Sequence, residues 1–292
     1  MRERSLSACA LSLDATPHPD GVYVQALRKC ANAEVPARGD TLAKITTPRK
    51  VNNHDSYAGR LLVWTEIDVA GKWLDKEKND QLSDEEKSKI NIPDNAAPNY
   101  KTFNYVFTEK DHKIYVETKN DLGETLGVKT IRNIFDRLMS ADIQGETDYV
   151  IAVTVVPDEH VVEELLNLPH LKKLELKIRT PNADYASPEI RQRVLRMMEE
   201  NSAHVLEQTW TKPSNVEKLT PTKEVRELTL VAADTGYARA TDKPRNGPAK
   251  TVSTDDRPKA YSFTTGDGDT FFERLRAKVR RFMADKNKQV TR

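Results

Sequence analysis

The chain has 292 residues, of which 37% are apolar and 31% are charged, and its formal net charge is +1. This balance excludes a uniformly basic nucleic-acid-coating protein, and two cysteines in such a length exclude a disulfide scaffold and a cysteine-built zinc site. No apolar run approaches the roughly 20 residues that a membrane-spanning helix needs. We therefore expect a cytoplasmic protein of one large or two small domains, without a transmembrane segment.

The first hundred residues predict strands and a helix separated by polar stretches. Residues 5–13 carry apolar side chains on both faces of an expected strand, residues 22–33 follow helical spacing, and residues 60–68 form an apolar run. Such a run is typical of a strand in the middle of a sheet. Residues 34–58 are polar and contain proline and glycine, so we expect a long loop there. Residues 69–100 are predicted to form a surface insertion.

The densest strand signal follows this insertion and predicts a hairpin. A two-residue turn at 110–111 would pair Phe107 with Ile114. Alternation along the second strand would then place Glu117 and Lys119 on one face of the sheet.

A helix after residue 127 and a strand at 150–156 complete the first part of the chain. Apart from one extra strand, the order of these elements is that of a ferredoxin-like (split βαβ) layer. We therefore expect an α+β fold with a mixed sheet, ferredoxin-like elements and a helical C-terminal portion. The first domain is predicted to span residues 1–156, including the insertion at 69–100.

Residues 157–292 are predicted to form a second α+β domain. A short helix and a strand at 171–180 would complete a crossover with the preceding strand if the two strands are parallel. One later helix is expected to extend to Thr209, and another to end at Gly236. A hairpin over 237–253 and a final helix follow.

The final helix, predicted over residues 269–286, is strongly basic. Residues 270–292 carry eight basic and two acidic side chains, with apolar residues at helical spacing. Such a helix can dock by its apolar stripe and offer cations to phosphate groups. An anionic membrane surface, a protein groove, or a docked helix with a solvated basic face are the alternatives. The expected nucleic-acid contacts lie on this helix and the preceding hairpin, at Arg239, Arg245, Lys250, Arg274, Lys278 and Arg281.

A proline-aspartate followed by a strand with Glu-x-Lys resembles the motif of metal-dependent nucleases. Asp94 and Glu117 would hold Mg²⁺, and Lys119 would steady the attacking water or the developing charge. Glu66 is a second candidate for the other carboxylate. In the predicted hairpin, however, Asn104 and not a carboxylate lies opposite Glu117. A solvated strand face is the simpler interpretation, and outside the nuclease alternative we expect no cofactor.

Four stretches in combination resemble an uncharacterised bacterial family, a domain of unknown function. They are RLLVWTEID at 60–68, IYVETKN at 114–120, LKKLELKIRTPN at 171–182 and VAADTGYARA at 231–240. The resemblance covers roughly residues 55–260 and brings no catalytic residues with it. A family of this kind suggests a component of phage defence or of a mobile element.

The expected function is therefore that of a nucleic-acid-associated bacterial protein, a component of a phage-defence or mobile-element system. It would bind through the basic C-terminal helix and hairpin. Two alternatives stay open. One is the Mg²⁺-dependent nuclease, and the other is a protein-binding subunit of a larger complex or a homo-oligomer, with the 69–100 insertion and the last helix as interfaces. The residues do not choose between DNA and RNA.

Overall fold

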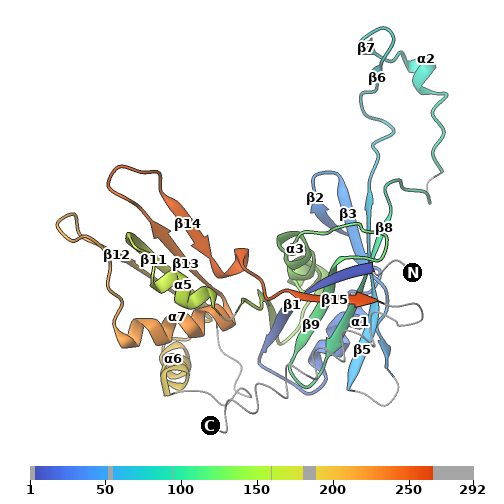
Figure 1. Ribbon diagram of the computed structural model, residues 1–292. Helices are drawn as coiled ribbons and strands as arrows, with labels where there is room; N and C mark the ends of the chain where they lie inside the picture. Colours follow the sequence, from blue (N-terminus) through green and yellow to red (C-terminus); the bar gives the residue numbers. More distant parts are fainter. Residues whose placement is uncertain (1–3, 52–54, 94, 159, 180–188, 266–292) are drawn as a thin grey trace.

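The computed structural model describes residues 4–51, 55–93, 95–158, 160–179 and 189–265. Two large sheets lie beside each other, and an extended arm projects from the first (Figure 1). All the strand pairs formed within these ranges are antiparallel. The α+β expectation is confirmed, whereas the expected mixed sheet is wrong. Within the same ranges, no helix has the length and apolar character needed to cross a membrane.

The first sheet has the strand order β10-β1-β9-β8-β5-β3-β2, with β15 beside β1 and β4 beside β5. Its strands are β1 (Arg4–Thr16), β2 (Val35–Arg38), β3 (Thr41–Ile45), β4 (Arg49–Lys50), β5 (Ser56–Thr65), β8 (Lys101–Thr108), β9 (Lys113–Lys119), β10 (Val150–Val155) and β15 (Tyr261–Thr265). β1 pairs with β9 along one edge and with both β10 and β15 along the other. The predicted strand at 5–13 is confirmed and is longer than expected.

Three helices accompany the first sheet: α1 (Val22–Lys29), α3 (Val128–Leu138) and α4 (Ala141–Gln144). The predicted helix after residue 127 is confirmed as α3. Its buried residues recur every three or four positions, as a helix with one core-facing stripe requires, and they are Ile131, Ile134, Phe135 and Leu138. They share one apolar core with α1 and with alternate residues of β1 and β9. Burying each such side chain stabilises the fold by about 1.5–3 kcal/mol.

β8 and β9 form the predicted hairpin with the predicted register. Phe107 pairs with Ile114, although the connection uses the four residues 109–112 and not a two-residue turn. Ile114 belongs to the core shared with the helices. The next residue, Tyr115, faces the other side and packs edge-on against Tyr261 of β15, with ring centroids 5.5 Å apart. Both faces of this strand are therefore buried.

The predicted loop at 34–58 is wrong, because three strands and the start of a fourth lie in it. β2 and β3 pair as a hairpin, and alternate residues of β2 are buried. Pro36 obscured this strand in the sequence. Proline has no backbone N–H and is tolerated mainly on edge strands, and β2 is the last strand in the order. β5 lies between β8 and β3, so the apolar run at 60–68 falls in an interior strand, as expected.

The arm lies within residues 69–100, and its outer part projects away from both sheets (Figure 1), while Pro98 and Asn99 bond to Thr65 of β5. Its elements are β6 (Leu74–Asp75), β7 (Asp80–Gln81) and α2 (Asp84–Lys87). Ser83 begins α2 with a capping box: its hydroxyl accepts from the Glu86 amide, and the Glu86 carboxylate accepts from the Ser83 amide. These reciprocal bonds satisfy amides that a helix start leaves unpaired. They explain how a single exposed turn forms without a core.

The second sheet has the strand order β12-β11-β13-β14. Its strands are β11 (Leu171–Arg179), β12 (Val205–Thr211), β13 (Tyr237–Asp242) and β14 (Lys250–Ser253), and its helices are α5 (Val161–Leu166), α6 (Glu189–Glu200) and α7 (Lys223–Thr235), followed by the short η1 (Thr254–Asp256). The prediction that a helix extends to Thr209 is wrong. The helix ends at Glu200, and the chain turns through Ser202, which has a φ of 49°.

Two further expectations concern this second sheet. The crossover is wrong, because β10 and β11 belong to different sheets. The helix ending at Gly236 and the hairpin after it are confirmed as α7 and the β13–β14 pair.

The chain leaves and re-enters the first sheet at the same place. The Asp158 amide donates to the Arg257 carbonyl at 2.8 Å, and the Lys259 amide donates to the Val156 carbonyl at 2.9 Å. Because β15 then pairs with β1, the division into two domains at residue 156 stays a prediction. The basic helix predicted at 269–286 lies outside the described residues.

Candidate functional site

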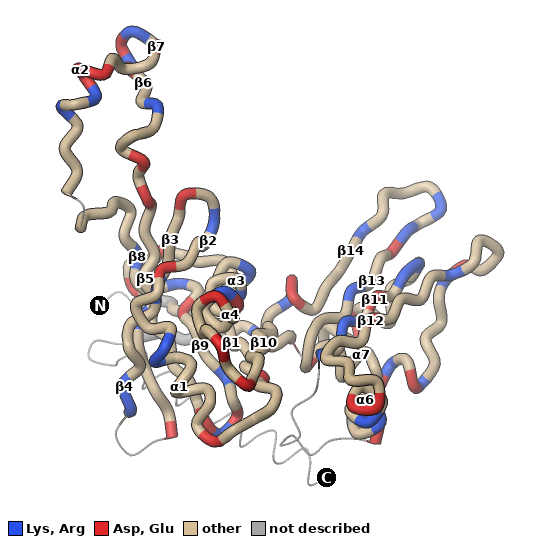
Figure 2. The backbone as a smooth tube through the Cα atoms, turned by 180° about the vertical axis from the view of Figure 1, so that it is seen from behind, with Lys and Arg blue, Asp and Glu red and all other residues tan. Residues whose placement is uncertain are grey.

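The second sheet has one apolar face and one polar face. Along β11, Leu174, Leu176 and Ile178 are buried in the core shared with α5, α6 and α7. The alternate side chains point to the opposite face, which we call the open face. It carries Lys173, Glu175, Lys177 and Arg179 of β11 together with Tyr237, Arg239 and Thr241 of β13, all half-buried. Figure 2 shows further basic positions toward the tip of the β13–β14 hairpin.

At the junction of the two sheets, one end of the open face forms a cavity of about 280 Å³. Four half-buried cations and one carboxylate line this cavity, which we call the basic pocket. The lining residues are Arg132, Val153, Thr154, Lys177, Arg179, Gly236, Tyr237, Arg239 and Asp255. They come from α3 and β10 of the first sheet, from β11 and β13 of the second, and from η1. The pocket therefore exists only where the two sheets meet.

Lys177 forms an ion pair with Glu207, 2.8 Å from its Oε1, whereas the three arginines have weaker contacts with groups of the protein. Arg179 donates to the Val153 carbonyl through Nη1 at 3.4 Å, and the Arg239 guanidinium lies 4.8 Å from the ring centroid of Tyr237. Arg132 is 3.9 Å from Asp136. Half-exposed pairs at this distance contribute about 0–1 kcal/mol, so a bound anion can compete with them.

Asp255 is the acidic member of the basic pocket. Burial raises the pKa of Asp255 above its ordinary value, although the charges of Arg132, Arg239 and Arg179 act in the opposite direction. The positive charge of these three guanidinium groups therefore does not compensate the carboxyl for its loss of solvation. The pocket as a whole keeps an excess of positive charge.

Thr154 contributes a hydroxyl to the wall of the basic pocket. The residue is only 3% exposed, and its Oγ1 is buried without a hydrogen-bond partner in the part of the chain that the structure describes. Buried polar atoms are nearly always satisfied by protein or water. Because Thr154 lines the pocket, a small shift of the β10 wall would let this hydroxyl donate to a group that enters it.

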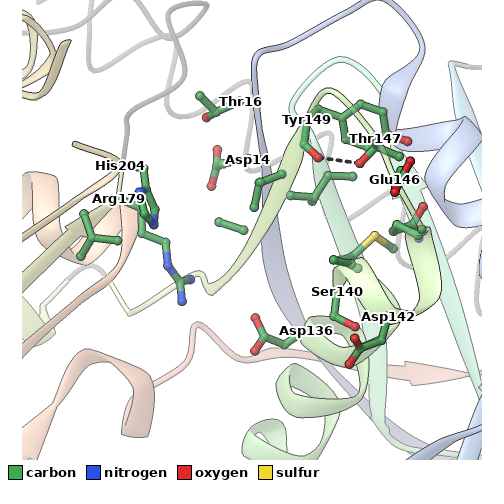
Figure 3. A pocket seen from close by; sticks show the side chains of 18 of the residues that line it. Asp14, Thr16, Asp136, Ser140, Asp142, Glu146, Thr147, Tyr149, Arg179 and His204 are labelled. Carbon is green, nitrogen blue, oxygen red and sulfur yellow. Dashed lines mark hydrogen bonds between the residues drawn. The ribbon is translucent and has the colours of Figure 1, made fainter. Parts of the chain in front are cut away.

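A larger cavity of about 800 Å³ adjoins the basic pocket and shares Lys177 and Arg179 with it. Figure 3 shows Arg179 and His204 on the side of the second sheet, with side chains of the first sheet around the rest of the cavity. Its acidic lining residues are Asp14, Asp136, Asp142 and Glu146. The two adjoining cavities therefore have opposite charge character.

The structure places the predicted nucleic-acid contacts in three settings. Arg239 lines the basic pocket, while Arg245 and Lys250 are exposed in the hairpin beyond it. The remaining three, Arg274, Lys278 and Arg281, lie outside the described residues. Sequence reasoning missed Lys177, Arg179 and Arg132. The strict alternation of strand 171–180 could have predicted that Lys177 and Arg179 share one face, but no local pattern links Arg132 to them.

The nuclease candidates are not gathered by the structure. Glu117 is 2% exposed, so its interpretation as part of a solvated strand face is wrong. Its Oε2 accepts from the Asn104 amide at 2.6 Å and from the Asn104 side chain at 3.0 Å. Asn104 in turn pairs with Arg60 of β5, and Glu66 lies six residues farther along that chain, roughly 20 Å away.

Burial is the main reason why the pKa of Glu117 rises to about 7. A carboxyl that holds its proton near neutral pH is a poor Mg²⁺ ligand. Lys119 is half-buried opposite Ser7, and Asp94 lies outside the described residues. Within the described ranges, no three His, Cys, Asp or Glu side chains gather as metal ligands would. The nuclease alternative stays an untested prediction.

The two cysteines offer no nucleophile. Cys9 and Cys30 are both buried and free, as expected from their number. Burial raises the pKa of each thiol to about 12, so neither forms the reactive thiolate at neutral pH.

Residues 4–280 match the model of a family described as a domain of unknown function, DUF4747. No curated protein matches the chain. The match is longer at both ends than the resemblance expected over residues 55–260. It includes β1 and α1 of the first sheet as well as both walls of the basic pocket. The chain therefore belongs to the DUF4747 family.

Proposed function

We propose that this protein binds nucleic acid, with the open face of the second sheet and the basic pocket as its phosphate-binding surface. The observation that carries this proposal is the gathering of Arg132, Arg179, Arg239 and Lys177 around one cavity. Contacts from arginine, lysine and hydroxyl groups to phosphate oxygens supply most of the sequence-independent affinity for nucleic acids. Because the net charge of the whole chain is only +1, this gathering is a local feature and does not reflect a generally basic surface.

The β13–β14 hairpin extends the same surface. Arg239 lies at the junction, and Arg245 follows six residues later, roughly 20 Å along an extended chain. That distance spans several nucleotides of a strand. Tyr237 supports the Arg239 guanidinium and also offers an aromatic face to a base. The basic helix at 269–286 would add to this surface. A role in phage defence or in a mobile element stays a prediction that rests on the kind of family alone.

The first sheet would act as the scaffold. We infer that β1, α1, β8, β9, α3 and β10 form a ferredoxin-like unit. The support for this is their chain order, the antiparallel order β10-β1-β9-β8, and the core that both helices share with the sheet. A disulfide that forms readily between cysteines placed on β1 and β8, which are not neighbours in this order, would contradict the inference.

Fluorescence anisotropy with labelled single- and double-stranded DNA and RNA tests the proposed binding. The logarithm of the association constant should fall linearly with the logarithm of the salt concentration. Arg179→Gln and Arg239→Gln should each weaken binding to all sequences and lower the salt slope by about one, because each removes a phosphate contact.

Arg196→Gln is the matched control, because it removes the same charge from the exposed surface of α6, on the helical side of the second sheet. Its affinity and salt slope should equal those of the unmodified protein. The proposal fails if no nucleic acid binds at low salt, or if the control weakens binding as much as the two pocket variants. Cleavage that requires Mg²⁺ in the same samples would favour the nuclease alternative instead.

A further inference from the structure

The basic pocket and the larger cavity adjoin and differ in charge, which suits a ligand with two chemically different ends. Lys177 and Arg179 line both cavities, so these two side chains would contact both ends of such a ligand. At one end are four cations and a single carboxylate. At the other are four carboxylates, which accept hydrogen bonds from hydroxyl and amino groups. An anionic group therefore prefers the basic pocket, and an uncharged, donor-rich group prefers the larger cavity.

Thr154 supplies an independent indication that the basic pocket takes an oxygen-rich anion. Leaving a buried hydroxyl without a partner is unfavourable, and a phosphate oxygen in the pocket would remove that penalty. The hydroxyl comes from β10 on one wall, whereas Arg179 and Arg239 come from β11 and β13 on the other. Donors from both walls would then surround the same anion.

Charge distinguishes between two forms of phosphate. A phosphodiester inside a strand carries one negative charge and is followed, one nucleotide away, by another phosphate. That second phosphate would meet the carboxylates of the larger cavity, where like charges repel. A phosphomonoester carries about 1.5–2 negative charges at pH 7 and has three free acceptor oxygens. The monoester fits the basic pocket better in both charge and hydrogen bonding.

We propose that the two adjoining cavities bind a nucleoside phosphomonoester, with its phosphate in the basic pocket and its nucleoside in the larger cavity. This inference rests on the proposed nucleic-acid binding. A volume of about 800 Å³ lies within the range of pockets that hold small organic ligands. The monoester is either a free mononucleotide or the phosphorylated end of a strand whose next phosphate stays outside the larger cavity, away from its carboxylates.

Three oligonucleotides of one sequence test the inference: one with a 5′-phosphate, one with a 3′-phosphate and one with neither. We expect a phosphorylated oligonucleotide to bind about tenfold more tightly than the unphosphorylated one, as one well-formed charged hydrogen-bond set allows. Adenosine monophosphate, adenosine and inorganic phosphate, each used as a competitor, distinguish a free nucleotide from a strand end. If the nucleotide itself is the ligand, adenosine monophosphate should compete better than the other two.

Thr154→Val provides the sharpest variant, because it keeps the shape of the side chain and removes only the hydroxyl. The preference for the phosphorylated strand should fall about tenfold, while the thermal midpoint stays the same or rises. Thr47→Val, at an exposed position between β3 and β4 of the first sheet, is the matched control and should change neither quantity. Asp255→Asn should act in the opposite direction and tighten phosphomonoester binding, because it removes the carboxylate of the basic pocket.

The possible failures are distinguishable. Equal binding of phosphorylated and unphosphorylated strands would overturn this inference and leave the proposed nucleic-acid binding intact. A preference that Thr154→Val and Asp255→Asn leave unchanged would place the monoester elsewhere and would also overturn it. Absence of binding to any strand at low salt, with no competition by adenosine monophosphate, would end both proposals.

Discussion

The two sheets hold their charged side chains in different environments. In the first sheet, both faces of β9 are buried, and the buried carboxyl of that strand, Glu117, has its pKa raised to about 7 by burial. In the second sheet, one face is apolar and the other keeps Lys177, Arg179 and Arg239 half-exposed. Charge that stays ionised and accessible can serve a ligand, whereas an enclosed carboxyl mainly affects stability. The difference directs the search for function to the second sheet and its junction with the first.

Gly236→Ala should give the largest effect, because it attacks the second sheet and the basic pocket together. A Cβ on Gly236 would overlap the backbone carbonyl oxygen of Lys177, which cannot move without disturbing β11. Overpacking against backbone costs more than against a flexible side chain, so we expect a loss of about 3 kcal/mol or more. Urea denaturation measures it. Gly247→Ala, which meets only the Pro244 side chain, should cost less than about 1 kcal/mol. Equal losses for the two would contradict the close approach.

Glu117→Gln sharpens the comparison from the side of the first sheet. The folded protein holds the Glu117 proton up to a pKa of about 7, whereas the unfolded chain loses it near 4.5. The unfolded state therefore binds fewer protons in this interval, and the free energy of unfolding falls as the pH rises. Each pKa unit of difference corresponds to about 1.4 kcal/mol. The titration of Glu117 therefore lowers the free energy of unfolding by roughly 3 kcal/mol between pH 4.5 and neutral pH, and adds little further change at higher pH.

The variant lacks this titration, so its stability should change less between pH 4.5 and pH 7 than that of the unmodified protein. Denaturation at several pH values measures the difference between the two curves. Glu85→Gln, on the exposed arm, should give a curve parallel to the unmodified one. A Glu117→Gln curve that is also parallel would mean that Glu117 is ionised in the folded protein.

Lys129→Ala should give the smallest effect, although it removes an ion pair that joins α3 to η1 beside the basic pocket. Lys129 lies 2.5 Å from Asp256, but the two side chains are 72% and 41% exposed. Exposed pairs are screened by water and salt, so we expect a loss below about 0.5 kcal/mol. Denaturation at low and high salt measures it. A loss above 1 kcal/mol would show that this contact helps to hold the two sheets together.

Local chemistry decided which elements could be predicted. Alternation along β8 and β9 was enough to give the register that pairs Phe107 with Ile114, because the face of each residue depends only on its position along the strand. Pro36 led to the wrong prediction of a loop, because proline is excluded from interior strands but tolerated in an edge strand such as β2. The extension of α6 to Thr209 failed because the turn at Ser202 carries no glycine or proline signal.

The candidate site was harder to predict, because it is assembled from distant segments. Arg239 was expected from the charge of its hairpin, and Lys177 and Arg179 follow from alternation on β11. Arg132 and Thr154 belong to the first sheet, and only the docking of the two sheets brings them to the basic pocket. No spacing in the sequence encodes that arrangement.

The chain crosses between the two sheets twice, and backbone bonds beside Pro157 and Pro258 hold these two crossings together. A sheet joined to its neighbour by a single chain segment can rotate about that segment. A sheet joined by two adjacent segments mainly bends about the line that connects the two crossing points. Such bending would widen or narrow the basic pocket without separating its walls. A molecule bound across the junction would thus add one more link between the two sheets, and one that can be removed.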